Sequence, residues 1–332
     1  MIVNADMRWP EGTGIGMVQF SVASRVPSDI TICDLRIGTR IGSPLSPASV
    51  ALALSRRAFR EGVFWNPGFV PPLWSRVPSV VTVHDLTHLH YYTRYHAAYY
   101  NAVMKPLYRR CAAVICVSEF TRNEFLNWSG LSPEIVFTVH NGVSEDFSPR
   151  SMDGNLAYPY VLYVGNQRAY KNLERLIRAY SETSLPASGV HLVLTGDPNI
   201  QLQLVATQCR VASLLHFSGR VDKQSIVKLY RGARILAFVS LYEGFGLPIL
   251  EAMAAGVPVI TSSVSAMPEI AQDAALVVEP TSTAAIAHGL ECLNSDELLR
   301  ARLVRLGLLN AKRFSWDATA ASTWQIVRSV TT

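Results

Sequence analysis

The stretch Tyr242-Glu-Gly-Phe-Gly-Leu-Pro-Ile-Leu-Glu251 decides the fold that we expect for this chain. The apolar run Ile235–Val239 before it is typical of a buried strand, and the glycine-containing Ser240–Leu247 is typical of a turn. Pro248 suits the first helical position, where its missing amide hydrogen costs nothing, and Gly256 suits the helix end. The sequence therefore predicts a strand, a glycine loop and a helix in succession.

This arrangement suits a ligand that has an anionic centre and hydroxyl groups around it. The start of a helix offers unpaired amides and a partial positive charge, and Gly244 and Gly246 let the backbone approach a ligand closely. The carboxylates of Glu243 and Glu251 are poor partners for an anion but accept hydrogen bonds from sugar hydroxyls. A nucleoside diphosphate sugar combines both kinds of group.

The two glutamates, with seven residues between them and Gly-Phe-Gly-Leu-Pro inside, resemble the signature of the retaining glycosyltransferases of family 4. Ala252–Thr261 and Met267–Glu269 continue the resemblance. It implies an α/β chain of the GT-B type, with two Rossmann-like, doubly wound domains that face each other across a cleft. It also implies that Glu243 holds the sugar hydroxyls and Glu251 the ribose, while the loop residues Gly244, Phe245, Gly246 and Leu247 surround the diphosphate.

Short apolar segments alternate with helical patterns along the chain, which favours parallel, doubly wound sheets. In the second half, helices are expected over Leu173–Glu182 and Lys223–Arg231. The polar, turn-rich Ser148–Asn155 is predicted to link the two domains. The expected strands are Met1–Asn4, Val63–Trp65, Ser79–Val83, Ala113–Val117, Val136–Val139, Tyr160–Val164, His191–Thr195, Ile235–Val239, Val257–Thr261 and Leu276–Val278.

These features predict an N-terminal, acceptor-side domain over residues 1–147 and a nucleotide-sugar-binding domain over residues 156–313. Residues 314–332 read as a helix, and Ser315 is its expected N-cap. The segment Phe314–Val327 resembles the last helix of GT-B enzymes, which implies that it crosses back to the N-terminal domain.

Two cations stand just before the predicted helix that begins at Leu173. Arg168 and Lys171 are unfavourable at a helix start unless an anion binds there, so they read as diphosphate ligands. The segment from Gly165 to Asn172 resembles the Gly-x(5)-Lys-Asn stretch of family 4, in which the lysine neutralises the leaving diphosphate. Lys171 occupies the matching position. The arginine lies elsewhere in many relatives, and a solvated basic loop is the alternative.

Three further segments carry candidate donor contacts through the same resemblance. Gly14 and Gly16 lie in a glycine-rich loop after the first strand, which lacks the complete dinucleotide-binding pattern. The resemblance implies that this loop lies against either the donor diphosphate or the acceptor. His84 ends an apolar strand, and the matching histidine of many relatives contacts the donor sugar. Arg220 and Val221 match a segment whose backbone meets the nucleobase. Ser118 and Asn141 are expected at strand ends that face the cleft.

A tyrosine-rich stretch is the candidate acceptor or membrane surface. Tyr91, Tyr95 and Tyr99 follow helical spacing, and Arg109 and Arg110 come soon after. Aromatic residues beside cations suit a membrane interface or a lipid-linked acceptor, and an ordinary packing face is the alternative.

Composition limits the possible classes of function. The 332-residue chain carries a net charge of +5, but it has no basic run or nucleic-acid motif, so no nucleic-acid partner is expected. No run reaches the roughly 18 apolar residues of a membrane helix, which favours a cytoplasmic protein, with peripheral contact at the inner face of the cell membrane as an option. The histidines 84, 88, 90 and 96 lack a supporting ligand cluster, so neither a metal nor another cofactor is expected.

The resemblance and these residues together predict a retaining glycosyl transfer from a nucleotide sugar to a saccharide or lipid-linked saccharide. The Gly-Asn-x(4)-Lys-Asn form is most similar to bacterial polysaccharide mannosyltransferases and favours GDP-mannose over UDP-glucose. Two alternatives stay open. One is another GT-B chemistry, such as a UDP-glucose-dependent transferase, a sucrose-type synthase or a phosphorylase. The other is a nucleotide-sugar-binding module without catalysis.

Overall fold

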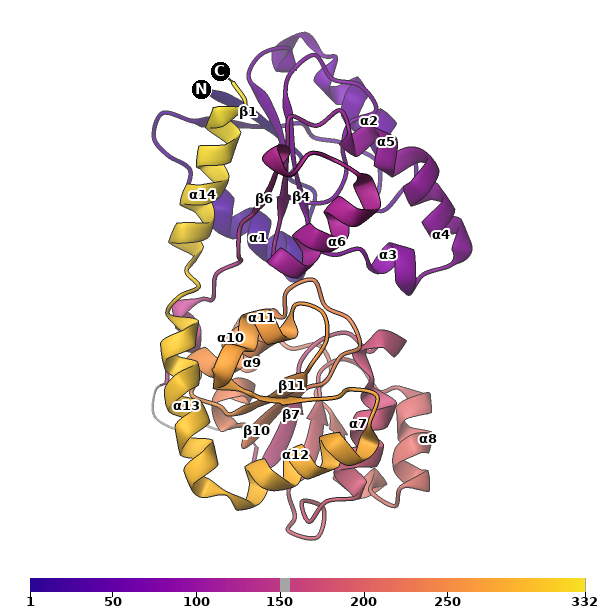
Figure 1. Cartoon of the computed structure of the whole chain (residues 1–332), viewed down its shortest axis with the longest axis vertical. Helices are drawn as coiled ribbons and strands as arrows, with labels where there is room; N and C mark the ends of the chain where they lie inside the picture. The colour runs from indigo at the N-terminus through magenta and orange to yellow at the C-terminus, as the bar shows by residue number, and fades with distance from the viewer. Residues whose placement is uncertain (150–155, 332) are drawn as a thin grey trace. The chain divides into compact units, whose positions relative to one another are not determined.

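Two six-stranded sheets organise the chain in the computed structural model, which describes residues 1–149 and 156–331. Each sheet belongs to a separate unit (Figure 1). Unit 1 contains Met1–Gly142 and the C-terminal segment that begins at Ser315, and unit 2 is Val143–Phe314. The segment that we expected to link the domains, Ser148–Asn155, falls mainly on residues 150–155 and so lies outside the described residues.

The sheet of unit 1 has the strand order β2-β1-β3-β4-β5-β6, and every pair is parallel. Its strands are β1 (Ile2–Ala5), β2 (Thr31–Asp34), β3 (Val63–Asn66), β4 (Ser79–Val83), β5 (Ala113–Cys116) and β6 (Val136–Thr138). Its helices are α1 (Gly14–Ala23), α2 (Ser46–Leu54), η1 (Arg57–Phe59), α3 (Thr87–His90), α4 (Arg94–Tyr99), η2 (Tyr100–Met104), α5 (Lys105–Tyr108), α6 (Glu119–Ser129), η3 (Pro133–Ile135) and α14 (Trp316–Ser329).

The sheet of unit 2 has the order β12-β11-β10-β7-β8-β9 and is also parallel throughout. Its strands are β7 (Tyr160–Tyr163), β8 (His191–Leu194), β9 (Leu215–Phe217), β10 (Ile235–Phe238), β11 (Val259–Ser262) and β12 (Leu276–Val278). Its helices are η4 (Glu145–Phe147), η5 (Ala169–Lys171), α7 (Leu173–Ser181), α8 (Ile200–Gln208), η6 (Ala212–Leu214), α9 (Lys223–Gly232), α10 (Leu247–Ala254), α11 (Met267–Ala271), η7 (Gln272–Ala274), α12 (Thr283–Ser295) and α13 (Glu297–Ala311).

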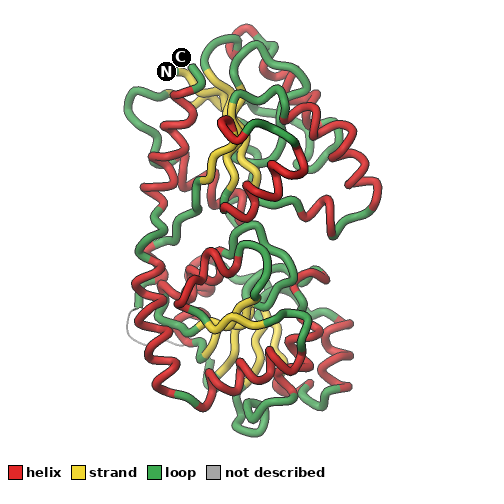
Figure 2. Tube along the Cα trace, in the orientation of Figure 1, coloured by secondary structure: helices red, strands yellow, loops and turns green. Residues whose placement is uncertain are grey.

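The predicted α/β fold with two doubly wound parallel sheets is confirmed. In each unit the strands lie in the middle, with helices around them (Figure 2). The ten strands that we expected are present, with ends shifted by a residue or two. β2 and β9 were not predicted. β2 reads Thr-Ile-Cys-Asp and is only partly buried, and β9 has three residues, so neither gives a strong apolar signal.

α14 belongs to unit 1, although it lies far in sequence from the other elements of that unit. The Ser315 side chain caps the helix, as expected, by accepting a hydrogen bond from the amide of Ala318. The buried indole of Trp324 lies 5.0 Å from the ring of Trp65 in β3, and its Nε1 donates to the carbonyl of Val22 in α1 at 3.2 Å. The C-terminal helix therefore supplies part of the core of unit 1.

Candidate active site

In unit 2 the candidate residues gather where the strand order reverses. The chain adds β8 and β9 on one side of β7 and then places β10 on the other side, so β7 and β10 are neighbours at the switch point of the sheet. Ligands of open α/β sheets bind outside the carboxyl ends of strands at such a point. The loops after the two strands are joined there, because the amide of Leu241 donates to the carbonyl of Tyr170 at 2.7 Å.

Lys171 and Glu243, one from each loop, form an ion pair. Lys171 Nζ lies 2.6 Å from Glu243 Oε1, and the two side chains are 9% and 12% exposed. The ammonium group also lies 5.2 Å and 5.4 Å from the centroids of the Tyr170 and Phe238 rings. The structure thus brings together the residues that we predicted to neutralise a diphosphate and to hold sugar hydroxyls.

The glycine loop that carries Glu243 is fixed by the segment after β11. The amide of Glu243 donates to Ser265 Oγ at 3.0 Å, and its carbonyl accepts from the amide of Ala266. Gly246, at the start of α10, has a φ of +107°, and a Cβ there would lie 3.1 Å from the Ile249 side chain. Glycine is therefore required at this turn by its backbone conformation, and a side chain there would also have to displace the end of the Ile249 side chain.

Glu251, in α10, is buried and has one close partner. The hydroxyl of Tyr230, from α9, donates to Glu251 Oε2 at 2.6 Å, and Tyr230 is fully buried. Burial raises the pKa of Glu251 to about 7, while the tyrosine hydrogen bond acts in the opposite direction. We did not predict a role for Tyr230. The sequence pattern of α9 indicates a buried helix face but does not show that the Tyr230 hydroxyl meets a carboxylate of another helix.

The segment between β7 and α7 has a fixed backbone. Gly165 has a φ of +146°, and its amide donates to Thr195 Oγ1 at 2.9 Å. Asn172 adopts a φ of +63°, and its side-chain amide donates to the carbonyls of Val239 and Pro280 at 2.9 and 2.7 Å. Asn172, which we did not select as a site residue, therefore fastens the lysine loop to the neighbouring loop.

Two arginines that we predicted as donor contacts, Arg168 and Arg220, are exposed. Arg168 is exposed and precedes the turn η5, whereas Lys171 is buried three residues later. The side chain of Arg220 is 93% exposed and lies 3.8 Å from Asp197, and Val221 is partly buried beside it. Both residues follow β9, the outermost strand on that side of the sheet. Among the described residues, Arg220 forms an ion pair with Asp197 and with neither Glu243 nor Glu251.

In unit 1, His84 follows β4, as predicted. Its Nε2 lies 2.6 Å from the carbonyl oxygen of Pro67, and because a carbonyl can only accept, Nε2 carries the proton. Burial lowers the pKa of His84, so the ring is neutral at pH 7 and its Nδ1 is an acceptor.

The N-terminal glycines are not loop residues, which corrects our expectation. Thr13 caps α1, and Gly14 and Gly16 form the first turn of that helix. A Cβ at Gly16 would lie 1.8 Å from the carbonyl oxygen of Pro10, so glycine is required there by close packing, with an ordinary helical conformation. The stretch therefore offers a helix start beside β1.

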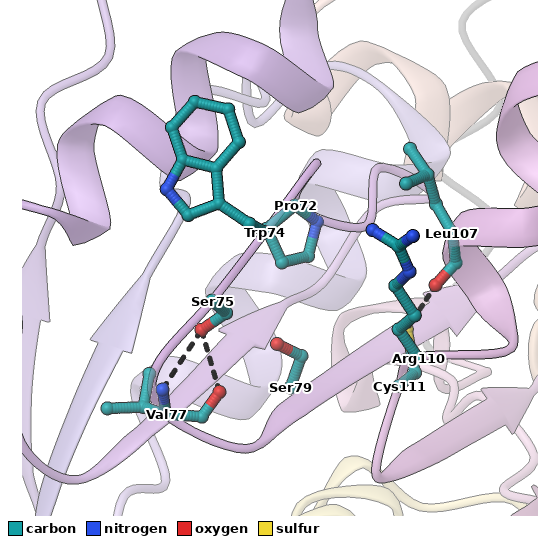
Figure 3. A pocket seen from close by; sticks show the side chains of 8 residues that line it. All are labelled: Pro72, Trp74, Ser75, Val77, Ser79, Leu107, Arg110 and Cys111. Carbon is teal, nitrogen blue, oxygen red and sulfur yellow. Dashed lines mark hydrogen bonds between the residues drawn. The ribbon is translucent and has the colours of Figure 1, made fainter.

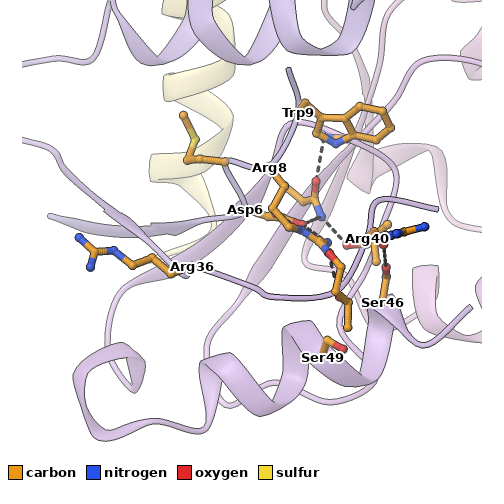
Figure 4. A network of polar contacts seen from close by, with 12 residues as sticks. Asp6, Arg8, Trp9, Arg36, Arg40, Ser46 and Ser49 are labelled. Atoms are coloured by element: carbon orange, nitrogen blue, oxygen red, sulfur yellow. Dashed lines mark hydrogen bonds and ion pairs between the residues drawn. The ribbon is translucent and has the colours of Figure 1, made fainter. Parts of the chain in front are cut away.

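A polar network that the sequence analysis did not identify joins β1 to β3, which meet at the switch point of unit 1 (Figure 4). Arg8 Nε and Nη2 donate to the two carboxylate oxygens of Asp6, both at 2.7 Å, and Asp6 is 1% exposed. Asn66 Nδ2 lies 3.4 Å from Asp6 Oδ2, and Arg8 Nη1 donates to the carbonyl of Thr39. The bidentate pair holds Arg8 at the carboxyl end of the sheet.

Among the buried polar atoms that have no hydrogen-bond partner in the described part of the chain, two lie in the loops just beyond the ends of strands. They are Ser240 Oγ, two residues after β10, and Asn141 Oδ1, three residues after β6. Ser118, the other strand-end residue that we selected, instead caps α6 by accepting from the amide of Thr121. Buried polar atoms are almost always paired in folded proteins, so Ser240 and Asn141 indicate where a ligand could bind.

The tyrosines at 91, 95 and 99 do not form one continuous helical face, contrary to our expectation. α3 ends at His90, and Tyr91 already has a non-helical backbone. The side chain of Tyr95 is largely exposed, whereas the hydroxyl of Tyr99 donates to the carbonyl of Pro44 at 2.8 Å. Arg109 and Arg110 likewise separate, because Arg109 donates to the Ser129 carbonyl and Arg110 to the Leu73 carbonyl.

Within residues 1–149 and 156–331, no group of three or more His, Cys, Asp or Glu side chains is arranged to hold a metal ion. The helices of the same residues include none that is both long and apolar enough to cross a membrane.

Comparison with known proteins decides the family. Residues 146–307 match the family described as "Glycosyl transferases group 1", and residues 51–147 match "Glycosyltransferase Family 4". The chain is 32% identical to O-antigen chain mannosyltransferase B of Escherichia coli over 298 residues, which cover 84% of this chain and 77% of that protein. This chain belongs to glycosyltransferase family 4.

Other relatives agree with this assignment. The glycosyltransferase is 25% identical to the serotype-specific mannosyltransferase WbdA of Escherichia coli, over 64% of this chain but only 28% of that protein. Anabaena HepE, solved in complex with UDP and glucose, superposes with a TM-score of 0.78 at 17% identity, over 99% of both chains. At that identity the structural likeness shows the shared GT-B fold.

Proposed function

We propose that this glycosyltransferase moves a hexose from a nucleotide sugar to a hydroxyl of a saccharide or lipid-linked saccharide, with retention at the anomeric carbon and GDP-mannose as the preferred donor. The observation that carries the proposal is the Lys171–Glu243 ion pair at the switch point of unit 2. A diphosphate would give the lysine an anion, and sugar hydroxyls would give the glutamate donors. The names of the related mannosyltransferases support mannose.

Charge on the leaving diphosphate grows toward the transition state, so a fixed cation beside it accelerates the reaction. Lys171 takes that role, with the amides at the start of α10 and the exposed Arg168 as further donors. Glu243 orients the sugar, and Glu251 accepts hydrogen bonds from the ribose through the oxygen that Tyr230 does not occupy. The proposal needs no metal ion.

The acceptor is assigned to unit 1. The Asp6–Arg8 pair and the unpaired Oδ1 of Asn141 follow strands of that sheet and are suited to the hydroxyls of the acceptor, while the Nδ1 of His84 remains the candidate contact for the donor sugar. A phosphorylated or diphosphate-linked saccharide would in addition use Arg36 and Arg40, which the structure leaves exposed (Figure 4).

A donor screen tests the proposal. The purified chain is incubated with GDP-mannose, UDP-glucose and other nucleotide sugars, first without acceptor and then with mannosyl saccharides. We expect slow hydrolysis that is fastest with GDP-mannose, and an α-linked product by NMR. Preference for UDP-glucose would reassign the donor, a β-linked product would refute retention, and no turnover with any donor would favour a binding module.

Glu251→Ala tests the ribose contact separately from chemistry. Loss of a charged acceptor for buried hydroxyls should weaken binding of free GDP by roughly 1.5–3 kcal/mol, which isothermal calorimetry measures as a tenfold or larger rise in Kd. Glu279→Ala, at an exposed position of the same unit, is the matched control and should leave Kd unchanged. An unchanged Kd for Glu251→Ala would refute the ribose assignment.

A further inference from the structure

One exposed surface of unit 1 presents three large apolar side chains together. Leu52, Leu73 and Trp74 are 62%, 36% and 46% exposed. Hydrogen bonds join their segments, since Trp74 Nε1 donates to Ser55 Oγ at 3.3 Å and the amide of Leu73 donates to the carbonyl of Pro47 at 2.9 Å. We call this surface, with the arginines described next, the Trp74 face.

Three exposed arginines stand among these apolar side chains. Arg60 Nε donates to the carbonyl of Ser55, Arg110 Nη1 donates to the carbonyl of Leu73, and Arg76 lies two residues after Trp74. None of the three has an ion-pair partner in the part of the chain that the structure describes. Residues 45–80 contain four arginines and a single acidic residue, Glu61, so the segments that form the face carry an excess of positive charge.

A pocket of about 240 Å³ opens on the Trp74 face. Trp74 and Arg110 approach it from different segments, the loop before β4 and the turn after α5, and Pro72, Val77 and Leu107 contribute apolar walls (Figure 3). An indole, a guanidinium group and apolar walls around one pocket suit an amphipathic, negatively charged ligand.

This pocket lies at the amino ends of strands, away from the candidate acceptor residues. Ser79, which begins β4, and Cys111, just before β5, both line it, whereas His84 follows the carboxyl end of β4. A strand of five residues spans roughly 16 Å at about 3.3 Å per residue. The Trp74 face is therefore separate from the site described above.

We propose that the Trp74 face docks unit 1 on an anionic phospholipid bilayer. Trp74 would place its ring at the acyl boundary, with Leu52 and Leu73 beside it, while its N–H stays bonded to Ser55 Oγ. Arg60, Arg76 and Arg110 would contact lipid phosphates, and a phosphate group would enter the pocket between Trp74 and Arg110. A bilayer meets both requirements of the face, because it offers an apolar layer directly below a layer of negative charge.

The first experiment is flotation of the full chain with vesicles. We expect binding to vesicles of phosphatidylglycerol and phosphatidylcholine, loss of binding as the salt concentration rises, and weak binding to phosphatidylcholine alone. The variant Arg60→Glu/Arg76→Glu/Arg110→Glu should lower the partition coefficient at least 50-fold, since each cation contributes roughly fivefold near such a surface. Trp74→Ser should lower it on the neutral and the anionic vesicles alike.

A matched control variant tests whether vesicle binding depends on the Trp74 face in particular. Arg94→Glu with Tyr95→Ser changes an exposed cation and an exposed aromatic elsewhere in unit 1 and should leave vesicle binding unchanged. All variants should keep the melting temperature of the parent chain, which would show that they are folded. They should also keep its GDP affinity, so that a loss of vesicle binding can be distinguished from a failure of the proposed donor site.

Three outcomes would overturn the proposal. They are no vesicle binding at low salt, binding that survives the arginine and Trp74 substitutions, and binding that depends on Arg94 and Tyr95 instead. Soluble glycerol 3-phosphate distinguishes a phosphate site from a bilayer surface. If it binds the chain in a Trp74- and Arg110-dependent manner while vesicles do not, the face binds a free phosphate ligand and the bilayer assignment is wrong.

Discussion

At the scale of single residues, Lys171 and Glu243 are largely buried and depend on each other. Removing one member of a buried ion pair leaves an uncompensated charge, which costs more than removing both. The same two side chains would have to exchange partners when a donor binds, since the diphosphate competes for the lysine. A single substitution therefore changes both stability and catalysis, whereas removing both charges together avoids the uncompensated charge and isolates the effect on catalysis.

Lys171→Ala should lower kcat by a factor of order 10²–10³, because we propose that the lysine stabilises charge on the leaving diphosphate in the transition state. Lys223→Ala is the matched control, since Lys223 is an exposed lysine of the same unit that pairs with Asp146. Steady-state kinetics with GDP-mannose measures both variants. A rise in KM at constant kcat would instead make Lys171 a uniform binding contact.

Glu251 should make the stability of the chain depend on pH. Its folded-state pKa of about 7 lies above the ordinary value of 4.5, so the folded state favours the protonated carboxyl group. The stabilisation is complete below pH 4.5 and is lost as the pH rises through 7. Glu251→Gln, which mimics the protonated form, should therefore become more stable than the parent chain at pH 8 by up to about 3 kcal/mol, and no more stable at pH 4.

Chemical denaturation of both proteins at several pH values measures this difference. GDP should reduce it, because ribose hydroxyls that donate to Glu251 favour the ionised carboxylate. A stability difference that does not change between pH 4 and pH 8 would show that Glu251 titrates as an ordinary exposed glutamate.

At the scale of elements, α14 is the part of the chain whose place depends most on distant residues. Its Trp324 is 1% exposed and contacts Trp65 of β3 and Val22 of α1. Trp324→Ala should destabilise unit 1 by roughly 3–5 kcal/mol, since a large buried side chain is replaced by a cavity. Gln325→Ala, on the exposed side of the same helix, is the control and should change stability by less than about 0.5 kcal/mol. Equal melting temperatures for Trp324→Ala and the parent chain would contradict the packing described here.

At the scale of the whole molecule, each unit has its own sheet and core, so a ligand of one unit should stabilise that unit selectively. GDP at about 100 times its Kd should stabilise unit 2 by roughly 2.7 kcal/mol. In Trp324→Ala, where unit 1 is weakened, a calorimetric scan should show GDP moving the upper transition and leaving the lower one in place. A single transition that moves as a whole would show that the units unfold together.

Sequence patterns predicted many of the strands and helix ends, because these features depend on residues that are close together in the chain. Short apolar segments marked ten of the twelve strands of the described residues, and the Ser315 cap and the stop at Gly256 were predicted from adjacent residues. The same patterns failed where the local signal was weak or ambiguous. The half-exposed β2 lacked an apolar run, Gly14 and Gly16 suited a loop as well as a helix start, and helical spacing continued through the turn after α3.

The sequence by itself determined the fold class, the family and the residue types of the donor site, since periodicity, turn chemistry and the paired glutamates are all carried by neighbouring residues. Only the tertiary structure decided that Lys171 meets Glu243 across 72 positions of the chain, that Tyr230 donates to Glu251, and that Asn66 at the end of β3 meets Asp6 after β1. These contacts depend on which strands are neighbours in the sheet. That order is set by how the crossover helices bury their apolar faces together, a property of the packed core as a whole, which no single segment of the sequence contains.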